Sequence, residues 1–223
     1  MKFSPFILIP LLTIISVSCN VDDIVSEFGN GKITAKEKLG EVMNAAKTGF
    51  AQDAQLASIY GREVNTAGEI DLLNTNSFNA FVYVVQSDSL QTNEFYVPVY
   101  GFGPVKTPNV FSTILSFIRD TTAKNIIEAA LGTLSTVAID PSANYSDSPE
   151  VLEILLAIHD VKTFRVLNPD SKIDMFLLPS KSINDSLGIA NTADWVVNFY
   201  SSTSSIVLWR SSSSGIVRNL SDL

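Results

Sequence analysis

The sequence predicts an α+β fold, in which helices pack on an antiparallel β-sheet, and three observations support this class. Apolar residues recur at helical spacing in some segments, whereas other segments are rich in the aromatic and β-branched residues that favour strands. Short polar turns separate neighbouring strand-like segments, as in antiparallel hairpins. Helix-start signals near residues 34 and 148 each precede a group of such strands. The chain is therefore expected to hold two related helix-plus-sheet units joined by a helical hairpin.

Residues 1–18 have the features of a cleaved signal peptide. Lys2 supplies a positive charge near the start, and the apolar segment that follows covers residues 6–17. A segment of about 12 residues is too short to span a bilayer as a helix, which requires about 20. The sequence therefore predicts an exported protein whose leader does not remain as a membrane anchor.

Cys19 directly follows the short residues Ser16, Val17 and Ser18. This arrangement resembles the lipobox of bacterial lipoproteins, in which the cysteine becomes the lipidated first residue of the mature chain. The resemblance implies that Cys19 is a lipid attachment site and that the protein is anchored to the cell envelope, at the outer membrane. Ser16 departs from the family pattern, which has Leu, Val or Ile at that position. Ordinary cleavage after Ser18 stays open as the alternative.

The composition argues against nucleic acid as a partner. The chain has 23 Asp and Glu residues against 15 Lys and Arg residues, a net charge of −8. Binding to a phosphate backbone requires clustered Lys and Arg side chains. Cys19 is the one cysteine, so with the anchor in place no thiol is left for a disulfide or a thiolate metal site.

Residues 19–32 are polar and predict a flexible tether, and residues 33–106 are assigned to the first helix-plus-sheet unit. Thr34 and Glu37 have the spacing of a capping box. The apolar residues that follow recur at helical spacing and predict a helix over about residues 35–60.

Strand-like segments complete this first unit, at residues 67–73, 78–85 and 94–100. The two longer segments are expected to be antiparallel neighbours, because a polar turn joins them. Pro98 cannot donate a ladder hydrogen bond, so its strand is expected at an edge or a bulge of the sheet.

Residues 107–147 are expected to form a helical hairpin and a connector. Apolar residues at helical spacing give two faces within 107–134, with a break at 120–122. Turn-forming residues dominate 139–148. The hairpin is expected to pack against a sheet, and binding of a partner is the alternative.

Residues 148–223 are assigned to the second helix-plus-sheet unit. Ser148, Pro149 and Glu150 supply a cap, a first-turn proline and an acid near the positive helix end, and they start a helix to about residue 159. The strand candidates that follow are residues 164–167, 173–178, 195–200, 204–210 and 215–218.

Part of this second unit resembles a PepSY-type module, a helix packed on a small antiparallel sheet. The residues that carry the resemblance are Asp194 to Phe199, Ile206 to Leu208 and Ser214 to Val217. Family members usually have an Asp-x-x-Thr-Gly turn here, whereas this chain has serines before Gly215. The resemblance implies a non-catalytic extracytoplasmic module that binds or restrains partner proteins such as peptidases.

The sequence contains no recognisable catalytic or metal-binding pattern. His159 is the one histidine, which excludes a His-rich metal site and favours a capping or half-buried structural role. The acids Glu150 and Glu153 lie at a helix start, where acids are expected anyway. Asp140, Asp147 and Asp170 fall in turns without the spacing of a calcium loop, and no phosphate-binding or dinucleotide-binding glycine motif is present. Trp195 is expected in the core, and Trp209 is the better candidate for an exposed aromatic residue.

These observations predict a lipid-anchored envelope protein that acts as a non-catalytic binding or interaction module, without a cofactor. Its expected partners are the membrane, through Cys19, and a protein or other envelope component. An envelope hydrolase with a carboxylate site that the sequence does not locate is one alternative. A structural subunit that uses residues 109–134 as its contact is another.

Overall fold

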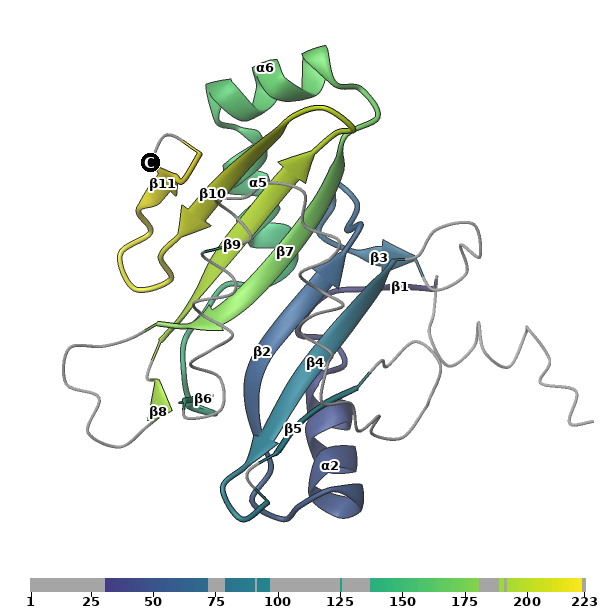
Figure 1. Ribbon diagram of the computed structural model, residues 1–223, viewed down its shortest axis with the longest axis vertical. Helices are drawn as coiled ribbons and strands as arrows, with labels where there is room; N and C mark the ends of the chain where they lie inside the picture. The colour runs from purple at the N-terminus through teal and green to yellow at the C-terminus, as the bar shows by residue number, and fades with distance from the viewer. Residues whose placement is uncertain are drawn as a thin grey trace, which may run out of the picture. The chain divides into compact units, whose positions relative to one another are not determined.

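The computed structural model describes residues 31–71, 79–90, 92–96, 125, 137–180, 189–190 and 192–221. Their main element is a seven-stranded antiparallel sheet with the order β11-β10-β9-β7-β2-β4-β5 (Figure 1). The α+β class predicted from the sequence is therefore confirmed. In chain order the strands are β2 (Gln55–Arg62), β4 (Ala80–Ser87), β5 (Thr92–Tyr96), β7 (Lys172–Pro179), β9 (Ala193–Tyr200), β10 (Ser205–Arg210) and β11 (Val217–Asn219).

The pairing of β2 with β7 joins strands from the two halves of the chain into one sheet. Ile59, Tyr60 and Gly61 lie opposite Leu177, Phe176 and Met175. On either side of this pair the strands follow in chain order, as β4 and β5 on one side and β9, β10 and β11 on the other. Each half thus contributes a helical segment followed by antiparallel strands, but the two groups of strands share one continuous sheet.

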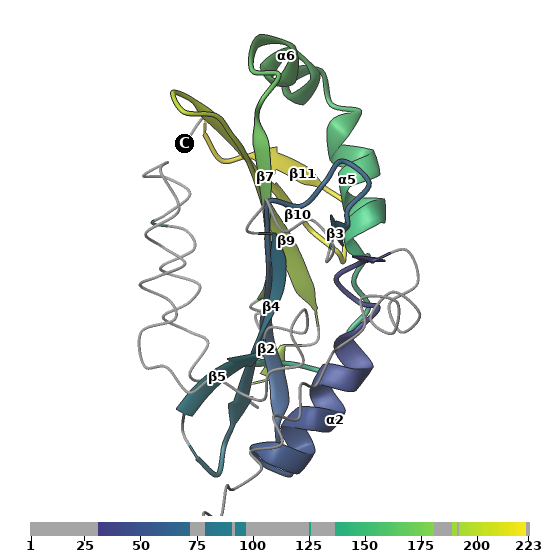
Figure 2. The same ribbon diagram turned by 90° about the vertical axis from the view of Figure 1, so that its right-hand side faces the viewer.

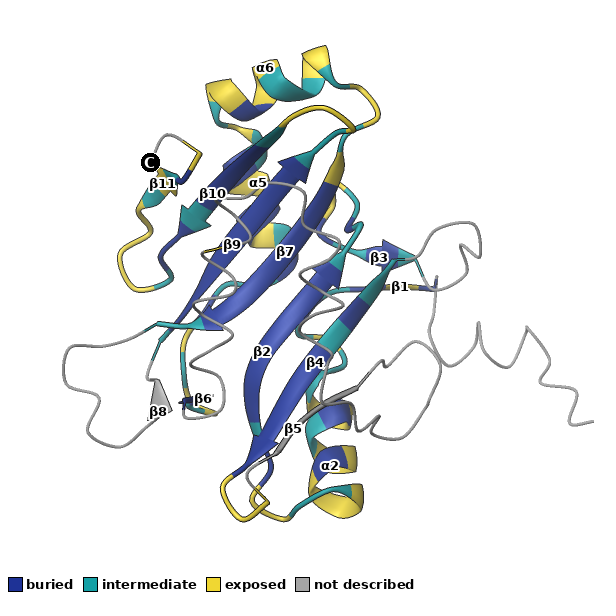
Figure 3. Ribbon diagram, viewed as in Figure 1, coloured by how far each residue is buried: buried dark blue, intermediate teal, exposed yellow. Residues whose placement is uncertain are grey.

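Three helices are described: α2 (Leu39–Gly49), α5 (Ser148–Leu156) and α6 (His159–Leu167). Figure 2 shows α2 and α5 against the same face of the sheet, and α6 beyond the end at which β7 begins. The core lies between this face and the two helices, and Trp195, Tyr83 and Phe81 are its largest fully buried side chains. The central strands are buried along nearly their whole length (Figure 3).

Two short pairs of strands accompany the main sheet. β1 (Lys32–Ile33) pairs antiparallel with β3 (Ile70–Asp71), and β6 (Ala138–Ile139) pairs parallel with β8 (Ile189–Ala190). β6 also contacts β2, and this contact holds the segment that follows β6, from residue 140, beside β2.

The predicted helix over residues 35–60 is wrong in its second half, because residues 55–62 form the central strand β2. Both faces of β2 are buried, so the strand lacks the apolar–polar alternation by which a half-exposed strand is recognised. Gly61 has a packing role in this strand, since a Cβ there would lie 2.6 Å from the ring of Phe81. The close approach of this ring to the backbone requires a glycine.

The predicted strand at residues 164–167 is also wrong, because these residues end helix α6. Phe164 and Val166 favour strands in isolation, but the short connection from α5 places the segment in a second helix, with Val161 buried against the core. Asn168 ends the helix by donating from its side chain to the Phe164 carbonyl at 2.9 Å. The helix leaves Val166 80% exposed and Leu167 74% exposed.

The helix start at residue 148 is confirmed, although the capping residue is Asp147 rather than Ser148. The Asp147 carboxylate accepts from the backbone at the helix start, and the Glu150 carboxylate accepts from the Asp147 N–H at 3.2 Å. Thr34 does not cap its own helix through its side chain. Its hydroxyl instead donates to Asp147 at 2.6 Å and ties the chain before α2 to the start of α5.

Most predicted strands are confirmed, including 78–85, 173–178, 195–200 and 204–210 as β4, β7, β9 and β10. β4 and β5 are antiparallel neighbours, and β5 is at the edge of the described sheet, as expected. The leader, the tether to residue 30, Pro98 and the hairpin at 107–134 (apart from Asn125, which is helical) lie outside the described residues.

Candidate functional site

A groove beside α2 is a mainly apolar depression in the described part of the chain, and we name it the α2 groove. It encloses about 440 Å³ between α2, the start of β2 and the segment that follows β6. Small-molecule sites commonly have volumes of about 300–1,000 Å³. The lining residues are Lys36, Leu39, Gly40, Met43, Lys47, Ala54, Gln55, Leu56, Ile139, Asp140, Pro141, Ala143 and Tyr145.

One stripe of α2 and its approach forms a wall of the groove. Gly40, Met43 and Lys47 lie on one face of α2, at spacings of three and four residues, and Lys36 continues the stripe from the turn before the helix. Gly40 is in the middle of this stripe, and a Cβ there would meet no atom within 4 Å. The glycine therefore leaves open space along the wall.

The opposite wall, residues 139–145, is held in place by contacts from several elements. Lys36 donates to the Tyr145 carbonyl, and its ammonium lies 4.1 Å from the centroid of the Tyr145 ring. Trp195 in the core donates to the Ser146 carbonyl at 2.9 Å, and the Arg210 guanidinium donates to the Ser146 hydroxyl at 3.3 Å. These contacts give the groove a fixed second wall, which is the preorganisation that a binding site requires.

The charged side chains around the groove differ in whether they are free to bind a ligand. Lys36 is engaged with Tyr145, whereas Lys47 is exposed and has no ion-pair partner among the described residues. Asp140 accepts from the N–H and hydroxyl of Ser142 at 2.7 and 2.6 Å, and these bonds hold the pKa of its carboxyl below the ordinary value. An anionic ligand group would therefore be attracted to Lys47 and repelled by Asp140.

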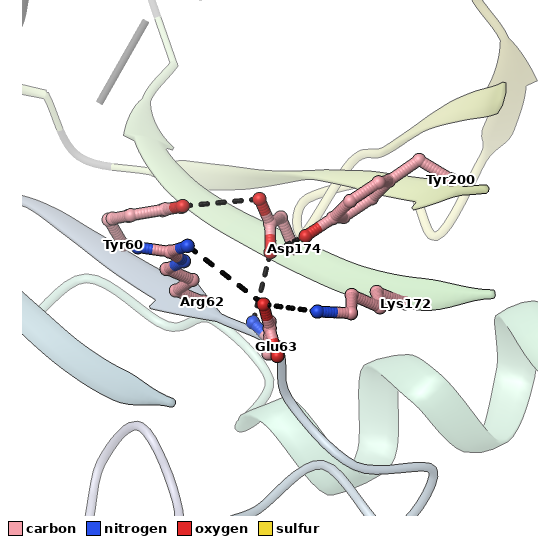
Figure 4. Close-up of polar contacts among 6 residues, drawn as sticks. All are labelled: Tyr60, Arg62, Glu63, Lys172, Asp174 and Tyr200. Atoms are coloured by element: carbon pink, nitrogen blue, oxygen red, sulfur yellow. Dashed lines mark hydrogen bonds and ion pairs between the residues drawn. The ribbon is translucent and has the colours of Figure 1, made fainter. Parts of the chain in front are cut away.

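A buried carboxylate, Asp174 on β7, is the second candidate (Figure 4). It is 1% exposed. Its carboxylate accepts from the Tyr60 hydroxyl at 3.1 Å, the Glu63 N–H at 2.9 Å and the Tyr200 hydroxyl at 3.4 Å. Glu63, at φ 49°, presents this N–H from a left-handed backbone conformation, and its own carboxylate lies 2.7 Å from the Lys172 ammonium. We call this set of five residues the Asp174 cluster.

Burial raises the pKa of Asp174 to about 6, from a usual value of 3.8. The Glu63 N–H and the Tyr60 hydroxyl, which favour the charged form, offset part of this rise. Burial and the neighbouring carboxylate likewise raise the pKa of the Tyr60 phenol above its ordinary value, so this phenol stays protonated as a donor. The arrangement could exchange one proton near neutral pH.

A second depression, of about 450 Å³, lies at the start of β7 and the end of β9, beside the Asp174 cluster. Lys172 and Tyr200 belong to both, and Tyr200 is the link, since its hydroxyl donates to Asp174. The depression itself contains one carboxylate, Asp170, and is otherwise lined mainly by serines and by residues 167–169. Asp174 is nearly inaccessible beneath it, so the two do not combine into an open acid–base site.

The residues that the sequence singled out are dispersed. His159 is exposed at the first position of α6, so a half-buried role is excluded. Trp195 is fully buried, as predicted, and Trp209 is half-buried with the Arg218 guanidinium 5.4 Å from its ring centroid. Asp147 and Glu150 cap α5, and Cys19 lies outside the described residues.

The sequence did not single out either candidate. The α2 groove could have been suspected from the helical spacing of Lys36, Gly40, Met43 and Lys47, but its other wall lies about 100 residues later in the chain. Asp174 had no local signal, because its partners Tyr60 and Glu63 come from β2 and the turn after it.

The described residues contain no cluster of three or more His, Cys, Asp or Glu side chains that could hold a metal ion. Within the same residues, no helix is both long and apolar enough to cross a membrane.

Comparisons with protein-family models, curated proteins and solved structures found no match to this chain. The resemblances to lipoprotein leaders and to PepSY-type modules accordingly stay predictions.

Proposed function

We propose that this chain is an exported, lipid-anchored protein of the bacterial cell envelope that acts as a non-catalytic binding module. The observation that carries the binding role is the α2 groove, which combines an apolar lining with a fixed second wall and an available lysine. Concave sites with mostly apolar lining and a few polar groups are the usual form of ligand sites.

The hydrolase alternative has less support. A carboxylate pair for hydrolysis must reach the substrate from both sides of the bond that is cleaved. Each of these two depressions is lined by one carboxylate, Asp140 in the α2 groove and Asp170 in the second depression. Asp174 has a suitable pKa, but it is 1% exposed and its oxygens are occupied by three donors.

The anchoring part of the proposal is tested at Cys19. We expect the wild-type protein to incorporate radiolabelled palmitate and to sediment with membranes, and a Cys19→Ala variant to lose both properties. Lipid chains each contribute about 0.8 kcal/mol per buried methylene, so two or three chains retain a protein firmly. An unlabelled wild-type protein, or a Cys19→Ala variant that stays with the membranes, contradicts the lipid anchor.

The binding part is tested by photo-crosslinking in cells that express the full chain. A photoreactive amino acid replaces Pro141, an exposed residue of the groove lining, or, as a control, the exposed Lys162 on α6. We expect a discrete adduct from position 141 that disappears when Gly40→Phe fills the groove and persists with Gly49→Phe. A Cβ at either glycine would meet no atom within 4 Å, but only Gly40 lines the groove. Equal adducts in both Phe variants would remove the groove from the function.

A further inference from the structure

We infer that the α2 groove takes a single-chain amphiphile with one carboxylate, a free fatty acid. This inference rests on the proposed binding function of the same groove and adds the chemical class of the ligand. Three features of the groove carry it: its apolar lining, the position of its one available cation and the charge around it.

The lining provides the surface for an apolar chain. Leu39 and Met43 are half-buried on α2, so part of each side chain faces open space. Leu56 and Ile139 lie deeper, at 7% and 2% exposure. An alkyl chain placed between these side chains leaves water without separating any polar group from its partner.

The two lysines of the stripe have different roles. The Lys36 ammonium donates to the Tyr145 carbonyl and lies over the Tyr145 ring, so it already stabilises the second wall. Lys47 lies seven residues beyond Gly40 in α2, about 10 Å further along the helix at 1.5 Å rise per residue. A ligand that extends along the stripe would therefore place its anionic group at Lys47 and its chain toward Lys36.

The surrounding negative charge favours a ligand that carries a single negative charge. The chain has a net charge of −8, and Asp140 lines the groove as an ionised carboxylate bonded within its own turn. A polyanion would be repelled by this field, whereas a single carboxylate gains from Lys47 and loses little elsewhere. Among the described residues, the groove lining offers no second lysine that is free to bind an anionic group, which also favours a ligand with a single negative charge.

The open space beside Gly40 accommodates the alkyl chain of the proposed ligand. It lies between Lys36 and Lys47 on the stripe, and a side chain there would project into open space rather than into the core. A bulky residue at position 40 would occupy the space proposed for the alkyl chain while leaving the packing of α2 unchanged. Gly49, at the end of the same helix and outside the groove, is its matched control.

The test is photo-labelling of the full chain, in the membranes of the expressing cells, with a dodecanoate analogue that carries a diazirine in its chain. We expect labelled peptides from the α2 groove, and competition by dodecanoate at about fivefold lower concentration than by dodecanol, as an exposed ion pair provides. Lys47→Ala should weaken labelling about fivefold, and Lys162→Ala should leave it unchanged. Gly40→Phe should abolish labelling, and Gly49→Phe should preserve it.

Other outcomes overturn the inference in distinguishable ways. Equal competition by dodecanol and dodecanoate, or undiminished labelling of Gly40→Phe, rejects the fatty acid. If only an acidic amphipathic peptide or a phospholipid displaces the label, the ligand class is wrong although the groove remains a binding site. If the groove peptides stay unlabelled and the photoreactive residue at position 141 gives no adduct in cells, the proposed binding function itself fails.

Discussion

Asp147 and Asp174 connect the same two halves of the chain, yet they do so in different surroundings. Asp147 accepts from Thr34 and Lys36, and Asp174 accepts from Tyr60 and Glu63. The residues in each pair are 111 to 114 positions apart. Asp147 is half-buried at a helix start, whereas Asp174 is 1% exposed on a central strand. We call the first set of contacts the helix junction and the second the sheet junction.

The difference shows two ways to satisfy a carboxylate that joins distant segments. At the helix junction, two of the donors are the Ser148 and Lys36 N–H groups, at 2.7 and 3.0 Å, and another is the Thr34 hydroxyl. The two N–H groups are backbone donors that need an acceptor in any case. At the sheet junction, each donor to Asp174 comes from a different strand or turn. Burial also disfavours the charged form of the Asp174 carboxylate that accepts these hydrogen bonds. The helix junction should therefore depend on local geometry, and the sheet junction on ionisation.

The largest effect is expected at the helix junction from Gly68→Ala. Gly68 has φ +79°, and its carbonyl accepts from the Ser148 hydroxyl at 2.6 Å. A Cβ would lie 2.3 Å from the backbone nitrogen of Pro149. Left-handed strain of about 1–2 kcal/mol and overpacking of about 1–3 kcal/mol together predict a loss of about 4 kcal/mol in unfolding free energy. Denaturant titration of the purified protein measures it.

Gly215→Ala is the control for that substitution. Gly215 has φ +70°, but a Cβ there would meet no atom within 4 Å. We expect only the backbone strain, about 1–2 kcal/mol. Equal losses at both glycines would show that the contact with Pro149 is easily relieved, and that the helix junction is less tightly packed than this contact implies.

The next largest effect is expected from truncation of the two carboxylates, which should destabilise the sheet junction more than the helix junction. We expect Asp174→Ala to be about 3 kcal/mol less stable than Asp174→Asn, because Ala leaves the buried Glu63 N–H and Tyr60 hydroxyl without an acceptor. The same comparison at Asp147 should give about 2 kcal/mol or less, since Asn and Asp are equivalent helix caps and water can reach the site. A larger difference at Asp147 would reverse the ranking.

The pH dependence of stability should distinguish the sheet junction most directly. Burial raises the pKa of Asp174 to about 6, so between about pH 4 and pH 6 the folded state holds a proton that the unfolded state releases. The stability contributed by protonated Asp174 is complete below about pH 4 and is lost as the pH rises through 6. A shift of about two pKa units corresponds to about 3 kcal/mol.

Asp174→Asn is the reference for this measurement, because it keeps the shape and removes the titration. The unfolding free energy of the wild type minus that of the variant should fall by about 2.4 kcal/mol from pH 4 to pH 7. A difference that is constant with pH would mean that Asp174 is not held in the protonated form in this interval.

Local patterns predicted the helix junction far better than the sheet junction. Ser148, Pro149 and Glu150 mark a helix start within a few residues, and the error was one position in the cap. Asp174 gave no signal, because its environment is set by the register of β7 between β2 and β9. Cross-strand register depends on segments over a hundred residues away in the chain, which no local window contains.

The same reason explains the misassigned strand and the missed groove. β2 is buried on both faces, so its sequence carries no period-2 pattern, and Ala54, Ala57 and Ile59 also match helical spacing. The α2 groove needs residues 139–145 as its second wall, and only the tertiary fold brings them to α2. The α+β class was predictable because it depends on the types of segment rather than on their partners.

The smallest effect is expected from the ion pair at the rim of the sheet junction. Lys172 lies 2.7 Å from the Glu63 carboxylate, but its side chain is 51% exposed. Lys172→Ala should therefore cost no more than about 0.5 kcal/mol, as for other solvent-screened pairs, and the loss should shrink in high salt. Denaturant titration at low and high ionic strength measures both quantities.

Glu63→Ala removes the same pair from its other side, together with the longer ion pair to Arg62 at 3.9 Å, and keeps the backbone N–H that donates to Asp174. If Glu63 stabilises the sheet junction through its backbone N–H alone, Lys172→Ala, Glu63→Ala and the double variant should have equal unfolding free energies within about 0.5 kcal/mol. Glu63→Gly should be more stable than Glu63→Ala by about 1 kcal/mol, because φ 49° is unstrained for glycine. A loss above about 1.5 kcal/mol in Lys172→Ala would instead show that the carboxylate of Glu63 holds the turn, so that the sheet junction has two charged supports rather than one.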